Sequence, residues 1–282
     1  MGEKTDIEWC DSTLNLMMGC DGCELRAGTV NTCYAGQIVD KMVSSPKGPP
    51  KGWPLAFDKP LIFAERILLL DKWKDLTGTD RPEKPWLNGL PRVIFLNDMG
   101  DTFTESLPIN WLWPFMEHIA GCPHILLLLT KRPKRMAEFF GKYVGCPPNV
   151  WPGTSITGPE NMSRVADLVT IKSRRLWVSA EPLLSPINLP TKNMETPSLN
   201  WVIVGGESGQ GARPTNIEHI RHVVQQGKSA NVPVFVKQLG SNAVDQQSDM
   251  PEAPPYEYLF NSRKGGDMQE WPEDLRVREF PH

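Results

Sequence analysis

The chain has 282 residues, with 30 Lys and Arg against 33 Asp and Glu, so its formal net charge is -3. Hydrophobic residues make up 40% and charged residues 22%, which excludes a disordered or collagen-like chain. No apolar run approaches the roughly 20 residues that cross a bilayer. The charged start MGEKTDIEW also lacks the apolar region of a secretory signal, so we expect a cytoplasmic protein without a membrane partner.

The N-terminal part of the chain predicts three features in order. A short strand is expected at residues 6–10. The Pro-, Gly- and Lys-rich segment 44–60 can be neither a helix nor a central strand. An amphipathic helix is expected next, at residues 61–76.

From residue 92 onward, short apolar runs rich in β-branched and aromatic residues begin at intervals of 25 to 31 residues. The runs cover residues 93–96, 124–129, 150–153, 176–178, 201–204 and 232–236. Helical patterns lie between them, for example at 133–144, 161–171 and 217–229. Continuous apolar strands that alternate with helices predict a parallel sheet buried on both faces.

Six such units and an N-terminal strand predict an α/β fold, a partial or complete (β/α) TIM-like barrel. The alternative is an open doubly wound sheet, but the units repeat without a visible break into two halves. We expect residues 1–240 to form the barrel, with a cysteine-rich loop near the N-terminus. The polar, Pro-rich residues 241–282 are expected to be a C-terminal extension packed on it.

Polar or charged residues follow every apolar run, at the place where active sites lie in such folds. They are Asn97, Asp98 and Asp101, then Thr130, Lys131 and Arg132, then Thr154 and Ser155, then Ser179 and Glu181, then Gly205, Gly206 and Glu207, and finally Lys237 and Gln238. An unpaired charge beside a buried strand is costly. These groups are therefore expected either to bind a ligand at the barrel mouth or to form a structural ring of salt bridges. The paired glycines would allow a close backbone approach, although the full nucleotide-binding patterns are absent.

Three cysteines form the strongest local pattern. Cys20, Cys23 and Cys33 lie within 14 residues, next to glycines that let the loop curl. Since cytosolic thiols stay reduced, a cluster of this kind more often binds metal than forms disulfides. Three thiolates can ligate three irons of a 4Fe–4S cluster and leave the fourth iron open. An open iron is what radical S-adenosylmethionine chemistry requires, so the pattern favours that chemistry.

Two other interpretations of the cysteines stay open. With Cys10, the spacing C-x9-C-x2-C-x9-C would suit a tetrahedral structural zinc site. The cysteines could also be buried hydrophobic residues, although their spacing beside glycines argues against this. Cys122 and Cys146 stand alone and receive no predicted role.

Taken together, these residues resemble a known family. The matching stretches are IEWCDSTLNLMMGCDGC with CYAG, FLNDMGDTF, LLLTKRPKRM, WPGTSI, VSAEPLLSPI, WVIVGGESGQGARP and VPVFVKQLG, spread over about residues 7 to 240. The sequence is similar to a phage-associated family of unknown function with a three-cysteine motif, itself regarded as similar to radical S-adenosylmethionine enzymes. Members commonly have Thr in place of Cys10, and their cysteine spacing differs. The standard C-x3-C-x2-C signature is absent here.

The resemblance implies a barrel of the radical S-adenosylmethionine type and a set of cofactor contacts. Cys20, Cys23 and Cys33 would hold a 4Fe–4S cluster. The loop after the second strand, with Asn97 and Asp98, would meet the methionyl amino group of S-adenosyl-L-methionine. The remaining cofactor contacts would be Lys131 or Arg132 at its carboxylate, Thr154, Ser155, Ser179 and Glu181 at the ribose, and Gly205, Gly206 and Glu207 near the adenine. Asp101 and Lys237 are expected near the substrate.

The sequence therefore predicts a radical S-adenosylmethionine enzyme that generates a 5′-deoxyadenosyl radical and modifies a nucleic-acid base or nucleotide, with electrons from an external donor. Two basic segments, 47–53 and 131–135, could line a path for phosphates. The first alternative is a zinc-stabilised barrel that binds nucleic acid or a partner without catalysis. A second is a hydrolase with Asp98, Asp101, Glu181 and Glu207 around a divalent metal.

Overall fold

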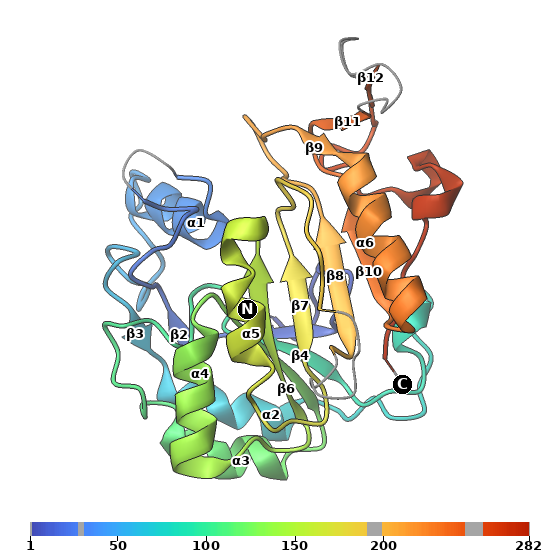
Figure 1. Cartoon of the computed structure of the whole chain (residues 1–282). Coiled ribbons are helices and arrows are strands. Elements are labelled where there is room, and N and C mark those ends of the chain that lie inside the picture. Colours follow the sequence, from blue (N-terminus) through green and yellow to red (C-terminus); the bar gives the residue numbers. More distant parts are fainter. Residues whose placement is uncertain (1, 28–30, 191–198, 246–255, 282) are drawn as a thin grey trace. The chain divides into compact units, whose positions relative to one another are not determined.

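The computed structural model describes residues 2–27, 31–190, 199–245 and 256–281. The chain divides into two units. Unit 1 comprises residues 1–152 and 171–174, and unit 2 comprises residues 153–170 and 175–282. Parallel strands and helices occur in both units (Figure 1).

Unit 1 is built on three parallel strands in chain order. They are β1 (Ser12–Leu14), β4 (Val93–Leu96) and β5 (Ile125–Thr130). A short antiparallel pair joins β2 (Met17–Met18) to β3 (Leu61–Ile62). The helices are α1 (Tyr34–Val43), α2 (Leu69–Lys72), α3 (Met116–Gly121) and α4 (Pro133–Phe139), with short 3₁₀ helices at Ala64–Leu68, Pro85–Leu87 and Trp113–Phe115 and a π-helical turn at Phe140–Val144.

Unit 2 holds four parallel strands, again in chain order. They are β6 (Val150–Ile156), which begins in unit 1, then β7 (Trp177–Ala180), β8 (Trp201–Gly205) and β10 (Val234–Gln238). A second sheet has the order β12 (Tyr256–Glu257), β11 (Ala243–Asp245), β9 (Thr215–Asn216). The helices are α5 (Ser163–Leu168) and α6 (Ile217–Ala230), with 3₁₀ helices at Pro159–Asn161, Met268–Glu270 and Glu273–Leu275.

Aromatic residues fill the core of unit 2. Trp177 of β7 and Trp201 of β8 are completely buried, and their ring centroids lie 5.7 Å apart. The helix α6 lies along β8 and β10 (Figure 1). The C-terminal segment packs on the same strands, because Phe280 approaches the Trp201 ring at 4.5 Å and Trp201 Nε1 donates to the Glu279 carbonyl. Residues near the C-terminus are therefore part of the core of unit 2.

These observations confirm a mixed α/β fold. The described residues contain seven parallel strands with helices between them, and within each unit the strands follow the chain order. That order agrees with a (β/α) barrel, whereas a doubly wound sheet reverses its order at a switch point. The finer assignment to the radical S-adenosylmethionine type stays a prediction, as does the division into residues 1–240 and 241–282. In the described part of the chain, no helix is both long and apolar enough to cross a membrane.

The predicted strand at residues 6–10 is wrong. These residues form turns, and the first strand is β1 (Ser12–Leu14). The cause is Lys84, whose Nζ donates to the carbonyls of Thr5, Ile7 and Cys10 at 2.8, 2.7 and 2.6 Å. Carbonyls that converge on one ammonium cannot also point alternately outward as a strand requires.

The predicted helix at residues 61–76 is also wrong in part. Its first residues form β3, and only Ala64–Leu68 and Leu69–Lys72 are helical. The backbone N–H of Phe63 donates to the Leu16 carbonyl, which ties this segment to the chain before β2. Trp73 then turns to extended backbone and buries its side chain, which ends α2.

Most of the later elements are confirmed with shifted ends. The predicted strand at 93–96 and the helix at 217–229 match β4 and α6 within one residue. The other strands extend further than the apolar runs, as β7 does to Ala180 and β10 to Gln238. Several polar residues expected after the strands therefore lie inside them, namely Thr130, Thr154, Ser155, Ser179, Gly205, Lys237 and Gln238.

Candidate functional site

The segment 19–33, which we call the cysteine loop, connects β2 to α1 in unit 1. Its start lies against the loop that follows β4, since the N–H of Gly19 donates to the Met99 carbonyl at 2.9 Å. A side chain at Gly100 would come within 2.6 Å of the Gly19 carbonyl oxygen. The close approach therefore requires glycine there, and it brings the cysteine loop to the carboxyl end of β4.

The residues next to and between the cysteines anchor this loop. Asp21 exchanges hydrogen bonds with Thr104 and accepts from the N–H of Ser106 at 2.9 Å. Burial alone would raise the pKa of Asp21, but the hydrogen bonds from Ser106 and Thr104 hold it at about 2. The Gly22 carbonyl accepts from Arg132 Nη2 at 2.9 Å.

A third anchor connects the loop to the end of β5. Lys131 Nζ donates to Glu24 Oε1 at 2.9 Å, and both side chains are largely buried. Together the three anchors fasten the cysteine loop to the loops after β4 and β5. The sulfur atoms of the cysteines take no part in these three anchors.

Asp101 organises the ends of both strands. Its carboxylate accepts from the N–H of Phe103 at 3.0 Å, from Thr130 Oγ1 at 2.6 Å, and from the N–H of Lys131 and Nη1 of Arg132, both at 3.0 Å. The residue is 8% exposed. All these donors belong to the protein, so in this structure Asp101 positions Lys131 and Arg132.

Each of two cysteine thiols lies within electrostatic range of a cation. Burial raises the pKa of Cys20 to about 12. A backbone hydrogen bond from Gly22 and the charge of Arg132 oppose this rise, and the charge of Asp101 adds to it. Burial also raises the pKa of Cys23, and there Lys131 opposes the rise. At both positions burial has the largest effect and favours the thiol, and the nearby cation opposes it only in part.

Cys33 caps the start of α1 and lies near Arg26, which is itself paired with Asp40. Its sulfur accepts from the N–H of Gly36 at 3.4 Å, as the N-cap of the helix. Arg26 lies over this first turn, because a side chain at Gly36 would meet its Nη1 at 2.5 Å. A hydrogen bond to Asp40 is the main cause that raises the pKa of Arg26, and the charge of Cys33 acts in the same direction.

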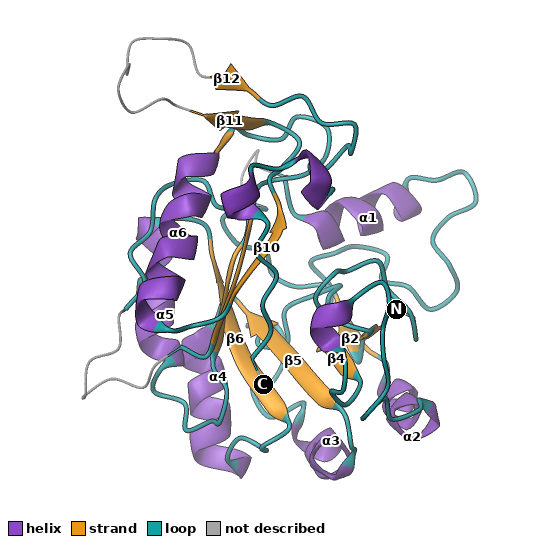
Figure 2. Ribbon diagram, turned by 90° about the vertical axis from the view of Figure 1, so that its right-hand side faces the viewer, coloured by secondary structure: helices purple, strands orange, loops and turns teal. Residues whose placement is uncertain are grey.

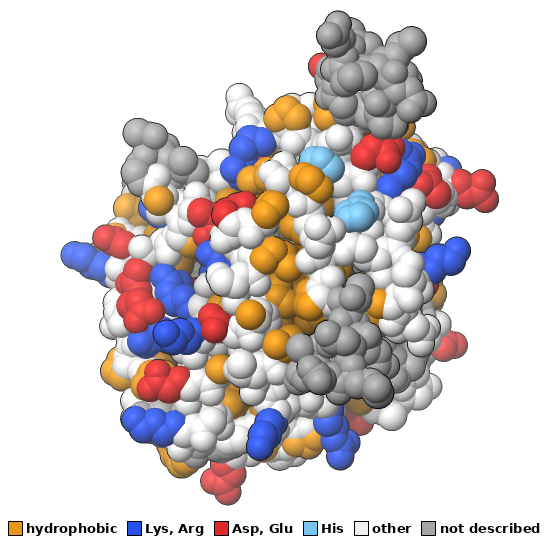
Figure 3. All heavy atoms as spheres, viewed as in Figure 1, with side chains coloured by type: hydrophobic (Ala, Val, Ile, Leu, Met, Phe, Trp, Pro, Cys, Tyr) orange, Lys and Arg blue, Asp and Glu red, His pale blue; other side chains and the backbone are white. Residues whose placement is uncertain are grey.

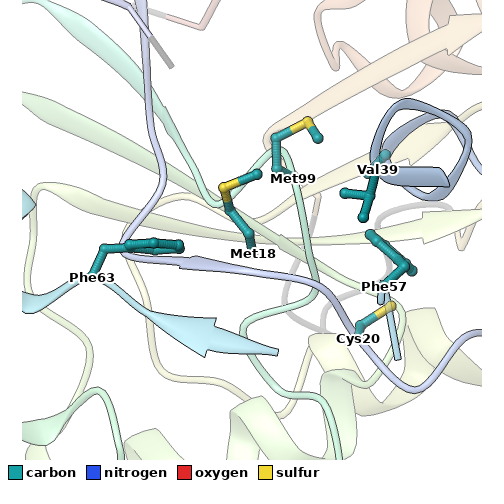
Figure 4. Close-up of a cluster of buried hydrophobic side chains, with 7 residues drawn as sticks. Met18, Cys20, Val39, Phe57, Phe63 and Met99 are labelled. Carbon is teal, nitrogen blue, oxygen red and sulfur yellow. The ribbon is translucent and has the colours of Figure 1, made fainter. Parts of the chain in front are cut away.

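Two of the cysteines share a hydrophobic cluster. Cys20 is 8% exposed and packs with Val39 of α1 and Phe57, as Figure 4 shows, and Cys33 packs against the same cluster. The N–H of Cys20 donates to the Phe57 carbonyl at 2.9 Å. Cys33 also adds to the electrostatic environment of both Cys20 and Cys23. The three cysteines therefore occupy one neighbourhood.

The side chains of this neighbourhood are of a kind that binds metal, but in this structure they are not arranged as a metal site. Within the described residues, no three Cys, His, Asp or Glu side chains are grouped so that they could hold a metal ion. The donor set fits an iron–sulfur cluster in kind, because soft thiolates are its usual ligands. Cys10 is fully buried and its pKa is raised, and the charges that act on it are Lys84, Asp98 and Asp11 rather than the other cysteines.

The two residues directly after β4 play different parts. Asn97 has a left-handed backbone with φ 62°, and its Oδ1 accepts from the N–H groups of Leu16 and Met17 at 2.8 and 3.1 Å. Asn97 is 2% exposed, so it holds the chain between β1 and β2. Asp98 is half-buried and accepts from Asn15 Nδ2 at 2.6 Å, and burial raises its pKa. Asp98 is thus the more suitable of the two for ligand contact.

The predicted site residues of unit 2 gather around Glu181. Lys237 Nζ lies 3.0 Å from Glu181 Oε1, and Ser179 Oγ donates to Oε2 at 3.3 Å. Ser155 Oγ donates to the Glu181 carbonyl at 3.4 Å, while Thr154 is fully buried inside β6. The structure therefore brings together polar groups from β6, β7 and β10.

The glycine-rich turn 205–213 packs tightly on the protein itself. A side chain at Gly206 would come within 2.2 Å of the Leu239 carbonyl oxygen and 2.6 Å of Thr215 Oγ1. Glu207 is paired with Arg213, whose Nε and Nη2 donate at 2.8 and 2.6 Å. In this structure Gly206 therefore serves close packing, and the carboxylate of Glu207 forms an ion pair within the turn.

Sequence reasoning missed several residues of these sites. They are Asp21, Glu24, Arg26, Asp40, Thr104 and Arg213. Glu24 could have been found from its place directly after Cys23, and Arg213 from its place within the GESGQGAR stretch. Thr104 carries no such signal, because its partner Asp21 lies 83 residues away in the chain.

A separate cavity of about 720 Å³ lies between α2 and α3. It holds the pair formed by His118 Nε2 and Asp71 Oδ1 at 2.9 Å. Its lining is Leu70, Asp71, Trp73, Pro114, Glu117, His118, Gly121, Cys122 and Pro123. None of the site residues predicted from the sequence is among them.

Comparison with known families adds one finding. A family model described as "Protein of unknown function (DUF5131)" matches residues 4–270. The chain belongs to this family. The match covers both the cysteine loop and the Glu181 group, so these features lie within DUF5131. No curated protein and no solved structure matches the chain. Since the family description names no activity, the similarity to radical S-adenosylmethionine enzymes and the phage association stay predictions.

Proposed function

We propose that this chain is an iron–sulfur enzyme that uses S-adenosylmethionine for radical chemistry. The observation that carries the proposal is the anchored cysteine loop, in which Cys20, Cys23 and Cys33 lie near Arg132, Lys131 and Arg26. The loop is fastened to the ends of β4 and β5, and active sites of parallel α/β folds lie at those ends.

The three cysteines would hold a 4Fe–4S cluster. Bound there, it would supply the electron that cleaves S-adenosylmethionine into methionine and a 5′-deoxyadenosyl radical. Ligation requires thiolates, so binding of the metal would have to displace the proton of Cys20, whose pKa is about 12, and release it to solvent. Arg132 and Lys131 are each paired with a carboxylate, so they would offset only part of the negative charge that thiolates bring to a buried loop.

Other side chains are suited to the remaining parts of the cofactor and substrate. The half-buried Asp98 offers a carboxylate to an amino group at the end of β4. In unit 2, Ser155, Ser179 and Glu181 offer the hydroxyl and carboxylate groups that bind a ribose. We propose a nucleic-acid base or nucleotide as the substrate and an external electron donor.

The decisive experiment is purification without oxygen. We expect a brown protein with equal iron and sulfide, which releases 5′-deoxyadenosine from S-adenosylmethionine when dithionite is added. Cys20→Ser, Cys23→Ser and Cys33→Ser should each lose the colour and the product. The matched controls Cys122→Ser and Cys146→Ser should keep both, since those residues lie outside the cysteine loop.

One result would replace the proposal with its alternative. If the protein holds one zinc and neither iron nor sulfide, and Cys10→Ser releases that zinc, the chain is a zinc-stabilised binding protein. Retention of iron by all three cysteine variants of the loop would also contradict the proposal, because the metal would then have other ligands.

A further inference from the structure

The segment 41–59, which we call the lysine loop, comprises the end of α1 and the chain that follows it (Figure 2). It carries four lysines and one acidic residue, Asp58, so its net charge is +3. The lysines, all exposed, are Lys41, Lys47, Lys51 and Lys59. Among the described residues, none of the four ammonium groups has a hydrogen-bonding or ion-pairing partner. The loop thus presents positive charge that the protein does not use internally.

The second basic segment, 131–135, is different. Lys131 is paired with Glu24 at 2.9 Å, Arg132 with Asp101 at 3.0 Å, and Arg135 with Glu105 at 2.7 Å. Basic and acidic side chains also lie intermixed over the left part of the face in Figure 3. Of the two segments that the sequence suggested for contact with phosphates, 47–53 has both of its lysines unpaired among the described residues, whereas in 131–135 Lys134 alone has no such partner.

The lysine loop is fixed at its base and open at its turns. Phe57 is 1% exposed, and its carbonyl accepts from the N–H of Cys20 at 2.9 Å. Gly48 and Gly52 have φ of 67° and 83°, and no atom lies within 4 Å of the place where either side chain would be. The turns that carry Lys47 and Lys51 therefore face solvent, while Phe57 at the base of the loop contacts Cys20 of the cysteine loop.

We infer that the lysine loop binds the phosphate backbone of a nucleic acid beside the cysteine loop. Ammonium groups bind phosphates as point charges, so the contact would be independent of base sequence. An acidic protein fits less well, because protein interfaces are poor in lysine and rich in exposed aromatic residues. The two aromatic residues of the loop, Trp53 and Phe57, instead pack in the hydrophobic cluster that contains Cys20. The inference rests on the proposed function in one respect only: it takes the bound nucleic acid to be the substrate of the enzyme.

The test measures binding by cluster-free protein, so a failure of the radical chemistry leaves it unaffected. Fluorescence anisotropy with a labelled single-stranded DNA of about 20 nucleotides should give a plot of log K against log [salt] with a slope of about -3, for four phosphate contacts. The variant K41Q/K47Q/K51Q/K59Q should bind at least about tenfold more weakly at about 50 mM salt and have a slope near zero.

The matched control removes four exposed lysines from outside the loop, as K4Q/K72Q/K74Q/K134Q. It has the same net charge as the loop variant, and it should keep both the affinity within about twofold and the slope. Circular dichroism will show that both variants are folded. If both variants lose the same affinity for the oligonucleotide, the effect depends on net charge alone and the inference is overturned. Binding of poly-L-glutamate as tightly as the oligonucleotide would also overturn it, in favour of an acidic protein partner.

Discussion

The cysteine loop of unit 1 and the glycine-rich turn of unit 2 are held in opposite ways. The hydrogen bonds from Lys131 and Arg132 to the cysteine loop join residues 107 and 110 positions apart. In the turn, Glu207 pairs with Arg213, only six positions away. A loop held by distant residues depends on the whole strand arrangement around it, whereas a turn with its own ion pair keeps its charges locally. A substitution in the cysteine loop or its partners should therefore affect distant parts of unit 1, whereas the effect of a substitution in the glycine-rich turn should stay within that turn.

The largest effect is expected from Asp101→Asn. The substitution removes the carboxylate charge that holds Arg132, a largely buried partner, and should lower the free energy of unfolding by about 3 kcal/mol. It should also lower iron content, because Arg132 holds the Gly22 carbonyl. Urea denaturation and iron analysis measure the two effects. Glu138→Gln, at an exposed carboxylate without an ion pair among the described residues, is the control, and equal losses in both variants would contradict the role of Asp101.

Gly206→Ala tests the turn of unit 2. Its new methyl group would meet the Leu239 carbonyl oxygen, so we expect a loss of about 2 kcal/mol in unfolding free energy with iron content unchanged. Gly121→Ala, where no atom lies within 4 Å of the new group, serves as the control. A fall in iron content together with stability would show that the two regions are not independent.

A smaller effect is expected from Arg213→Gln. The substitution leaves Glu207, which is 8% exposed, without its cation and should cost about 1 kcal/mol in urea denaturation. The exposed Lys228→Gln is a suitable comparison. A loss as large as that of Asp101→Asn would mean that the turn supports more of the fold than its local contacts suggest.

The smallest effect should come from Asp21, and it depends on pH. The pKa of Asp21 is about 2 in the folded chain against an ordinary value of 3.8, so its carboxylate stabilises the fold above pH 3.8. That contribution is lost as the pH falls through 2, and Asp21→Asn should then match the parent protein. The side chain is exposed and solvent screens it, so the difference at pH 7 should stay below about 1 kcal/mol. Denaturation curves across this range provide the measurement, and a difference that persists at low pH would contradict the assignment.

Much of the fold could be predicted because it depends on local patterns. The apolar run of β4 and the apolar face of α6 appear directly in the sequence. The ends of the strands could not be placed as well, since polar residues such as Ser179 and Lys237 continue the hydrogen-bonded ladder without interrupting it. The early strand failed for a different reason, namely a lysine some 75 residues away that no local pattern contains.

The sequence indicated which residues belong to the candidate site better than it indicated how those residues contact one another. Spacing alone drew attention to Cys20, Cys23 and Cys33, and the structure places them in one neighbourhood. The strand-end charges of Lys131 and Arg132 were also noticed, but their partners Glu24 and Asp101 emerge only when the chain is folded. Long-range pairing of this kind leaves no mark in a single sequence.

Lys84 has one more consequence. Its ammonium occupies a ring of three carbonyl oxygens, from Thr5, Ile7 and Cys10, much as a sodium ion would. Because this counter-charge is covalently tethered, the amino-terminal turn needs no salt from the medium to close. Acetylation of that single amine would remove the charge, and residues 5–10 would then lose the group that holds their three carbonyls together.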